Sequence, residues 1–240
     1  MSCFKIDEES AYAQTLNDVA APLKLIASVK VDPNRVVFAA ATALAATHGG
    51  ANFALLRANT IIEDPIQITR DVLEAAHQPV WVELGCTSGP MARLLIEARA
   101  EQVVLSNEAL LRPSLIRDVA LEIGSKATVV AVDCHAAGPG CIEVLDSEGR
   151  PSGFDCASWL EQIEVLGASA VILRPGPNVP SEGLLELVNS RSCEVYIDRP
   201  GWDAELVEAI GADGAVVQGA LGTRQHLDQV SVKSRRDLAG

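Results

Sequence analysis

The stretch Gly50-Ala51-Asn52-Phe53-Ala54-Leu55-Leu56-Arg57 recurs, with a few changes, as Gly167-Ala168-Ser169-Ala170-Val171-Ile172-Leu173-Arg174. Each copy is a small-residue turn, a short apolar run and an arginine where the run ends. The pattern returns at residues 211–218 and, more weakly, at residues 99–106. Four such copies in one chain predict a barrel of alternating strands and helices built from two related halves.

The rest of the chain follows the same alternation. Short apolar or β-branched runs are separated by Ala- and Leu-rich helical patterns, several of which open with a proline near the first turn. Regular alternation gives a parallel sheet, and eight strands allow the sheet to close. We therefore expect an α/β protein, a (βα)8 TIM barrel. The eight expected strands are residues 24–31, 53–58, 80–84, 103–106, 127–133, 170–174, 194–198 and 214–219.

Two segments are additions to this repeat. Residues 1–20 place several apolar side chains on one helical face, which predicts an N-terminal extra helix. We expect it to plug the bottom of the barrel, and docking onto a partner is the alternative. Residues 136–156 have the pattern of a β-hairpin inserted after the fifth strand. No linker or low-complexity tract interrupts the chain, so we expect residues 1–240 to form a single domain.

Composition limits the function classes. The chain is 48% hydrophobic and 4% aromatic, which predicts a large core of Ala, Val, Leu and Ile. A net charge of −13 argues against a nucleic acid or an anionic membrane as partner. The sequence has no long apolar run and no signal-peptide core, and its six cysteines show no paired spacing. We expect a cytoplasmic protein without a metal or other cofactor.

Three stretches between residues 80 and 173 have a specific spelling: 102–116 (QVVLSNEALLRPSLI), 128–133 (TVVAVD) and 149–155 (GRPSGFD). They resemble, in order, the fourth strand with its helix, the fifth strand and the hairpin of the cyclase subunit of imidazole glycerol phosphate synthase, a barrel of histidine biosynthesis. The related isomerase barrel of that pathway is similar too, but the hairpin favours the cyclase. The resemblance implies an ammonia-dependent ring closure on a ribosyl-phosphate substrate, a lyase reaction, with a glutaminase subunit as partner.

The chain departs from that family at its catalytic positions. The resemblance implies two aspartates, at the ends of strands one and five, as general acid and base. Here Asp133 keeps the second position, whereas Lys30 stands at the first. The long loop after strand one is missing, because Asp32-Pro33 leads almost directly into a helix. At the lower face, Lys24 is the one charged residue among the positions that match the family's charged gate.

The carboxyl ends of the strands form the active site in this fold, so the residues that end them should ring one mouth. Cations gather there although the chain is anionic, which favours an anionic ligand such as a phosphorylated small molecule. The related halves should place Arg57 and Arg174 on opposite sides, as a ligand with two phosphates requires. Alternatively, each arginine pairs with a neighbouring carboxylate and binds nothing. The mouth residues expected are Lys30, Arg57, Ser106, Asp133, Arg174, Asp198, Arg199 and Gln218.

Asp133 is the expected acid/base, and Lys30 is the second catalytic candidate. An ion pair between these two residues is the alternative, because it would lower the pKa of the carboxyl. Three functions stay open: the family's cyclase reaction, a changed activity on a related phosphosugar, and a catalytically inactive barrel that binds a phosphosugar or regulates a partner. The residues expected to bind phosphate or substrate are Arg57, Gly85, Ser88, Ser106, Asn107, Arg174, Asp198, Gly201 and Gly219.

Overall fold

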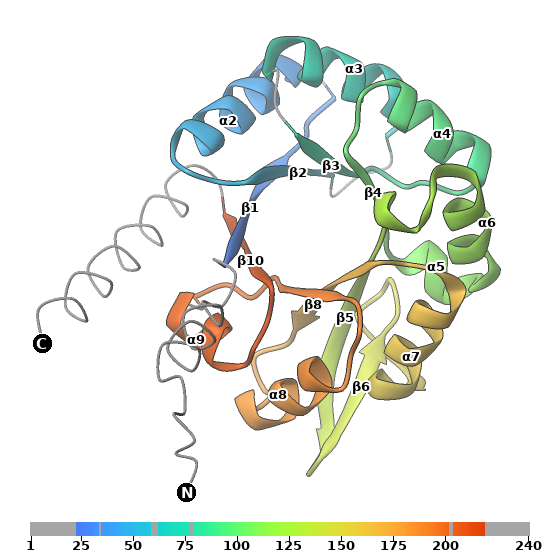
Figure 1. Cartoon of the computed structure of the whole chain (residues 1–240), viewed down its shortest axis with the longest axis vertical. Helices are drawn as coiled ribbons and strands as arrows, with labels where there is room; N and C mark the ends of the chain where they lie inside the picture. Colours follow the sequence, from blue (N-terminus) through green and yellow to red (C-terminus); the bar gives the residue numbers. More distant parts are fainter. Residues whose placement is uncertain (1–22, 34, 59–61, 77–78, 202–203, 219–240) are drawn as a thin grey trace, which may run out of the picture.

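The fold is a closed ring of parallel strands surrounded by helices (Figure 1). The computed structural model describes residues 23–33, 35–58, 62–76, 79–201 and 204–218. The strands of the ring follow the order β4-β3-β2-β1-β10-β9-β8-β5, and pairing of β4 with β5 closes it. The predicted (βα)8 barrel is therefore confirmed. The predicted N-terminal helix, residues 1–20, lies outside the described residues.

All eight predicted strands are present, and apart from β5 their ends agree with the prediction to within one residue. The strands of the ring are β1 (Lys24–Lys30), β2 (Phe53–Arg57), β3 (Val80–Glu83), β4 (Gln102–Leu105), β5 (Thr128–Gly138), β8 (Ala170–Pro175), β9 (Glu194–Ile197) and β10 (Gly214–Gln218). The helices in the described ranges are α2 (Val36–His48), α3 (Pro65–Ala76), α4 (Gly89–Glu97), α5 (Asn107–Leu111), α6 (Ser114–Ile123), α7 (Cys156–Leu166), α8 (Ser181–Asn189) and α9 (Ala204–Ala209), with a 3-10 turn η1 (Ser125–Ala127).

Alternate strand residues fill the inside of the barrel, because successive side chains of a strand point to opposite faces. Aromatic rings occupy its centre: the Trp81 ring lies 5.1 Å from Tyr196, edge-on, and 5.3 Å from Phe53. Gly214 pairs with Tyr196 in the register, and a Cβ there would lie 2.7 Å from Tyr196 Cδ1. A side chain at this position therefore cannot be accommodated beside the Tyr196 ring.

The remaining strand residues, which alternate with the interior ones, point outward and pack against the helices. α7 shows why these segments are helical: the Asp155 carboxylate accepts a hydrogen bond from Ser158 N at 2.9 Å and caps the first turn. Trp159 and Ile163 then face the barrel as buried residues four positions apart. Gly167, with φ +105°, ends the helix in the left-handed conformation that glycine adopts without strain.

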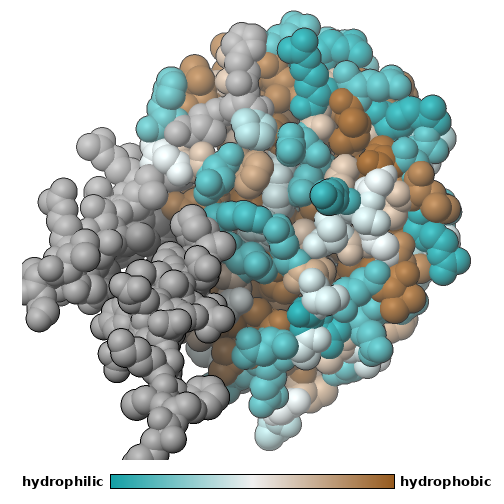
Figure 2. Space-filling view, in the orientation of Figure 1, coloured by the Kyte–Doolittle hydropathy of each residue, from teal (hydrophilic) through white to brown (hydrophobic). Residues whose placement is uncertain are grey.

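The predicted hairpin is confirmed as β6 (Cys141–Leu145) and β7 (Pro151–Asp155). β5 continues five residues past Asp133 because Cys134–Gly138 pair antiparallel with β6. The hairpin projects past α7 and α8 (Figure 1). Hydrophilic residues cover much of the face seen along the barrel axis, with hydrophobic residues between them (Figure 2). In the part of the chain that the structure describes, no helix combines the length and the apolar character needed to span a membrane.

Candidate active site at the barrel mouth

The sheet register brings charged side chains from five strands to one level of the barrel. In the register of adjacent strands, Lys30 lies beside Arg57 and Arg57 beside Glu83. On the other side of the ring, Asp133 lies beside Arg174. Asp198 follows β9, and its backbone N–H donates to Leu173 O at 2.8 Å, which places it beside Arg174. These residues have the same parity as the interior residues below them, so their side chains point into the mouth.

Two arginines and two carboxylates form one network across this mouth. Arg174 donates to both oxygens of Glu83, at 2.7 and 2.5 Å, in the bidentate geometry that guanidinium and carboxylate favour. Its Nε donates to Asp198 Oδ2 at 3.1 Å, and Arg57 Nη1 reaches the same oxygen at 2.5 Å. The side chains of Glu83, Arg174 and Asp198 are 10%, 15% and 5% exposed. The network is therefore largely desolvated.

The two arginines come from opposite sides of the ring, as expected, and the alternative in which they pair with carboxylates is the arrangement found in this structure. Their strands, β2 and β8, do lie on opposite sides of the ring, four positions apart in the strand order. The side chains are nevertheless long enough to meet at the centre, where both guanidinium groups bind Asp198. Two phosphates held far apart by these arginines are incompatible with that arrangement.

The two arginines differ in how many of their N–H donors bind carboxylates. All three nitrogens of Arg174 donate to carboxylates, and these partners raise the pKa of its guanidinium although burial alone would lower it. Arg57 is 24% exposed, and among the described residues it uses Nη1 alone. Among the described residues Arg57 therefore has more unused N–H donors than Arg174, whose three nitrogens all bind carboxylates.

Asp133 is half-buried beside this network. Within the described ranges its carboxylate has no hydrogen-bond donor and no cation within 4 Å, and Lys30, which is exposed, forms no ion pair with it. Burial raises the pKa of the Asp133 carboxyl; Arg174 opposes this, while Glu83 and Asp198 add to it. The expected alternative of an Asp133–Lys30 ion pair is not formed in this structure.

The expected phosphate-binding turns are at the same end of the barrel. Gly85, with φ +80°, follows β3, and the Ser88 hydroxyl caps α4 by accepting from Met91 N at 3.3 Å. Ser106 and Asn107 begin α5, where the Ser106 N–H and hydroxyl already donate to Glu108 at 3.3 and 3.1 Å. Gly201, with φ +80°, follows β9, and Gly219 lies outside the described residues.

Two features were not foreseen from the sequence. Arg199 points away from the central network and donates to Pro177 O and Val179 O, at 2.7 and 3.0 Å. At the opposite end of the barrel, Lys24 binds Glu194 at 2.6 Å, and the Tyr196 hydroxyl donates to the same carboxylate at 2.5 Å. The period-two spacing of Glu194, Tyr196 and Asp198 was the signal that all three share the interior face. No group of three potential metal-ligating side chains occurs among the described residues.

Comparison with known proteins agrees with this architecture. Residues 57–194 match the family model described as Histidine biosynthesis protein. The imidazole glycerol phosphate synthase subunit HisF of Acidobacterium capsulatum is 27% identical over 178 residues, which are 72% of this chain and 63% of that protein. The chain thus matches less than two thirds of the length of this relative. The resemblance seen in the sequence is confirmed, and the chain belongs to the histidine biosynthesis protein family as a HisF-like barrel.

Proposed function

We propose that this barrel is an enzyme that acts on a phosphorylated ribosyl compound, with Asp133 as its single general acid/base. The reaction is of the class carried out by the imidazole glycerol phosphate synthase cyclase, an ammonia-dependent ring closure, with activity altered by the changes at the mouth. A family relative whose name is that of a synthase subunit supports this reaction class.

The proposal rests on the burial of Asp133, on its lack of partners among the described residues and on its raised pKa. Asp133 is half-buried at the mouth, and among the described residues it accepts no hydrogen bond and forms no ion pair, so its carboxylate is available to a ligand. Burial raises its pKa toward the range in which one group can both accept and return a proton. A carboxylate with a purely structural role would be expected to have partners, as Glu83 and Asp198 do.

Lys30 and Arg57 supply the anion-binding side of the proposed site. They are neighbours in the register of β1 and β2, Lys30 is exposed, and among the described residues Arg57 donates through Nη1 alone. β1 and β5 are four positions apart in the ring, so this cationic pair faces Asp133 across the mouth. A phosphate held at Lys30 and Arg57 would direct the rest of the ligand toward the carboxylate.

A second candidate function is a phosphosugar-binding or regulatory barrel without catalysis. It is favoured by Lys30 at the position of the family's first aspartate and by the pairing of Arg174 with Glu83 and Asp198. In this case the mouth binds an anion through Lys30 and Arg57, but Asp133 transfers no proton.

The deciding experiment measures turnover of the linear cyclase substrate by the purified chain, with an ammonium salt as the ammonia source. Using the salt removes any dependence on a glutaminase subunit, which we propose as the natural partner. The variants are Asp133→Asn and, as a matched control, the exposed Glu148→Gln. We expect turnover that is lost in Asp133→Asn and kept in the control. No turnover by the folded wild-type chain, or equal turnover by Asp133→Asn, contradicts the proposal.

A binding measurement, taken together with turnover, distinguishes the enzyme from the non-catalytic barrel. Isothermal titration with the cyclase product should give a similar affinity for wild type and Asp133→Asn under either function, whereas Arg57→Gln should weaken it about tenfold, the effect of losing one charged hydrogen bond. Binding without turnover supports the non-catalytic barrel. Failure of the product to bind at all excludes both.

A further inference from the structure

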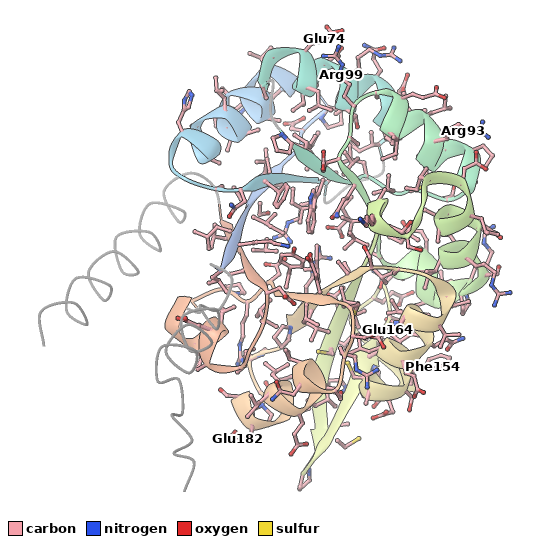
Figure 3. The ribbon with its side chains drawn as sticks, in the orientation of Figure 1. Glu74, Arg93, Arg99, Phe154, Glu164 and Glu182 are labelled. Carbon is pink, nitrogen blue, oxygen red and sulfur yellow. The ribbon has the colours of Figure 1, made fainter. Side chains whose placement is uncertain are left out.

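A pocket of about 350 Å³ lies outside the barrel mouth, between the turn that joins β5 to β6, the start of α7, and α8. This volume is within the range of small-molecule sites. None of the mouth residues discussed above lines it. Figure 3 labels Glu164 on α7 and Glu182 on α8, the two helices that contribute residues to the pocket. The lining residues are Gly138, Gly140, Cys141, Ile142, Asp155, Ala157, Pro180, Gly183, Glu186, Leu187, Ser190 and Arg191.

The pocket depends on glycine and on apolar walls. A Cβ on Gly183 would lie 3.0 Å from Ile142 Cδ1, so glycine lets the hairpin approach α8 closely. Gly138 and Gly140, by contrast, have open space where a side chain would stand. Ile142 and Leu187 form apolar walls and are 8% and 6% exposed. The result is a cavity with apolar walls on β6 and α8, lined also by residues of the turn between β5 and β6.

Arg191 provides a cation in the wall of this cavity. Its side chain is 10% exposed, yet its nearest carboxylate, Glu164, is 4.0 Å away. Glu164 instead accepts hydrogen bonds from Ser192 N and Cys193 N, at 2.7 and 2.9 Å. Arg191 donates to Ser190 Oγ at 3.1 and 3.0 Å and to Ala157 O at 3.4 Å. These contacts use three of the five guanidinium N–H donors and the carboxylate is at the limit of ion-pair distance, so one N–H on each Nη is left for an anion in the pocket.

Two exposed carboxylates also line the pocket. Glu186 is exposed on α8, and Asp155 is exposed at the end of β7, with Oδ2 bound by Ser158. These carboxylates would repel a ligand that carries only a negative charge. A ligand with one negative and one positive group can bind both Arg191 and the carboxylates.

We propose that this pocket binds a free α-amino acid with an apolar side chain. Its carboxylate pairs with Arg191, its ammonium group faces Glu186 and Asp155, and its side chain packs on Ile142 and Leu187. The site is separate from the barrel mouth, and the inference does not depend on the proposed activity there.

The test uses isothermal titration of the full chain with L-leucine, L-methionine and L-phenylalanine. Two analogues of leucine are matched controls: 4-methylpentanoate lacks the amine and 3-methylbutylamine lacks the carboxylate. We expect at least one amino acid to bind and both analogues to bind about tenfold more weakly, because each lacks one charged contact. Absence of binding by all three amino acids, or equal binding of an analogue, overturns the proposal.

Substitutions test whether the amino acid binds in this pocket. Arg191→Met should weaken binding about tenfold or more, and the exposed Glu186→Gln, which has little effect on folding, should weaken it less. Asp133→Asn, in the mouth, should leave it unchanged. Binding that is lost in Asp133→Asn, or kept in both Arg191→Met and Glu186→Gln, would place the amino acid elsewhere and refute the assignment.

Discussion

Asp198→Asn is the sharpest test of the network at the mouth. Asp198 is 5% exposed and is shared by Arg57 and Arg174, so the substitution removes a carboxylate from two largely buried guanidinium groups. Removing one partner of a buried ion pair costs about 3–5 kcal/mol. Arg174 keeps Glu83, so we expect the lower end, about 3 kcal/mol.

The assay is the thermal midpoint at pH 7, followed by circular dichroism. For a chain of this size, 1 kcal/mol corresponds to about 2–4 °C, so the midpoint should fall by about 6–12 °C. Glu148→Gln is the matched control, because it removes a carboxylate from the Arg150–Glu148 pair, in which both side chains are more than 60% exposed. That control should melt like wild type.

A double-mutant cycle shows whether the loss comes from the ion pair. Asp198→Asn combined with Arg57→Gln should cost less than the sum of the two single changes, by about 0.5–3 kcal/mol. An Asp198→Asn midpoint within the error of wild type, or strict additivity in the cycle, would refute the view that this network is a coupled, desolvated unit.

Three further predictions concern single residues. Asp133→Asn should raise the thermal midpoint at pH 7, because burial raises the pKa of this carboxyl and its ionised form therefore opposes folding. The gain should vanish below about pH 4, where the carboxyl is protonated in both the folded and the unfolded chain. A loss of stability at pH 7 would contradict this reasoning. Gly214→Ala should prevent accumulation of soluble folded protein in an expression test, whereas Gly138→Ala, where no atom lies within 4 Å, should fold normally. Tyr196→Phe should cost about 1.5–3 kcal/mol in urea denaturation at pH 7, because the hydroxyl donates to the ionised Glu194. Since the pKa of Glu194 is lowered in the fold, that cost should shrink as pH falls through its titration, and a cost independent of pH would argue against the hydrogen bond.

The fold could be predicted because each strand carries its own signal. An apolar run bounded by a turn and a polar residue marks β2 and β8 without reference to the rest of the chain. β5 was predicted too short for a physical reason: beyond Asp133 its residues are polar or small, and what extends the strand is pairing with β6 rather than burial. Such pairing is not encoded in the hydrophobic pattern of β5 alone.

The site was only partly predictable for a related reason. Strand ends identify which residues reach the mouth, and Arg57, Asp133, Arg174 and Asp198 are found there. Partner choice among them depends on side-chain reach across the barrel, between residues as far apart in sequence as Arg57 and Asp198. Pairing of the arginines with carboxylates was a stated alternative, whereas the ion pair of Lys24 with Glu194, which joins residues 170 positions apart, was not predicted.

The network has a consequence for the chemistry of Asp133. Two nearby guanidinium groups, those of Arg174 and Arg57, act to lower the pKa of this carboxyl. Glu83 and Asp198 bind the same arginines and raise the pKa of Asp133, so their charges offset those of Arg57 and Arg174. What remains is the effect of burial, which favours the protonated form. The network thus places two carboxylates beside Asp133 that oppose the effect of Arg57 and Arg174 on its pKa, as the proposed acid/base role requires.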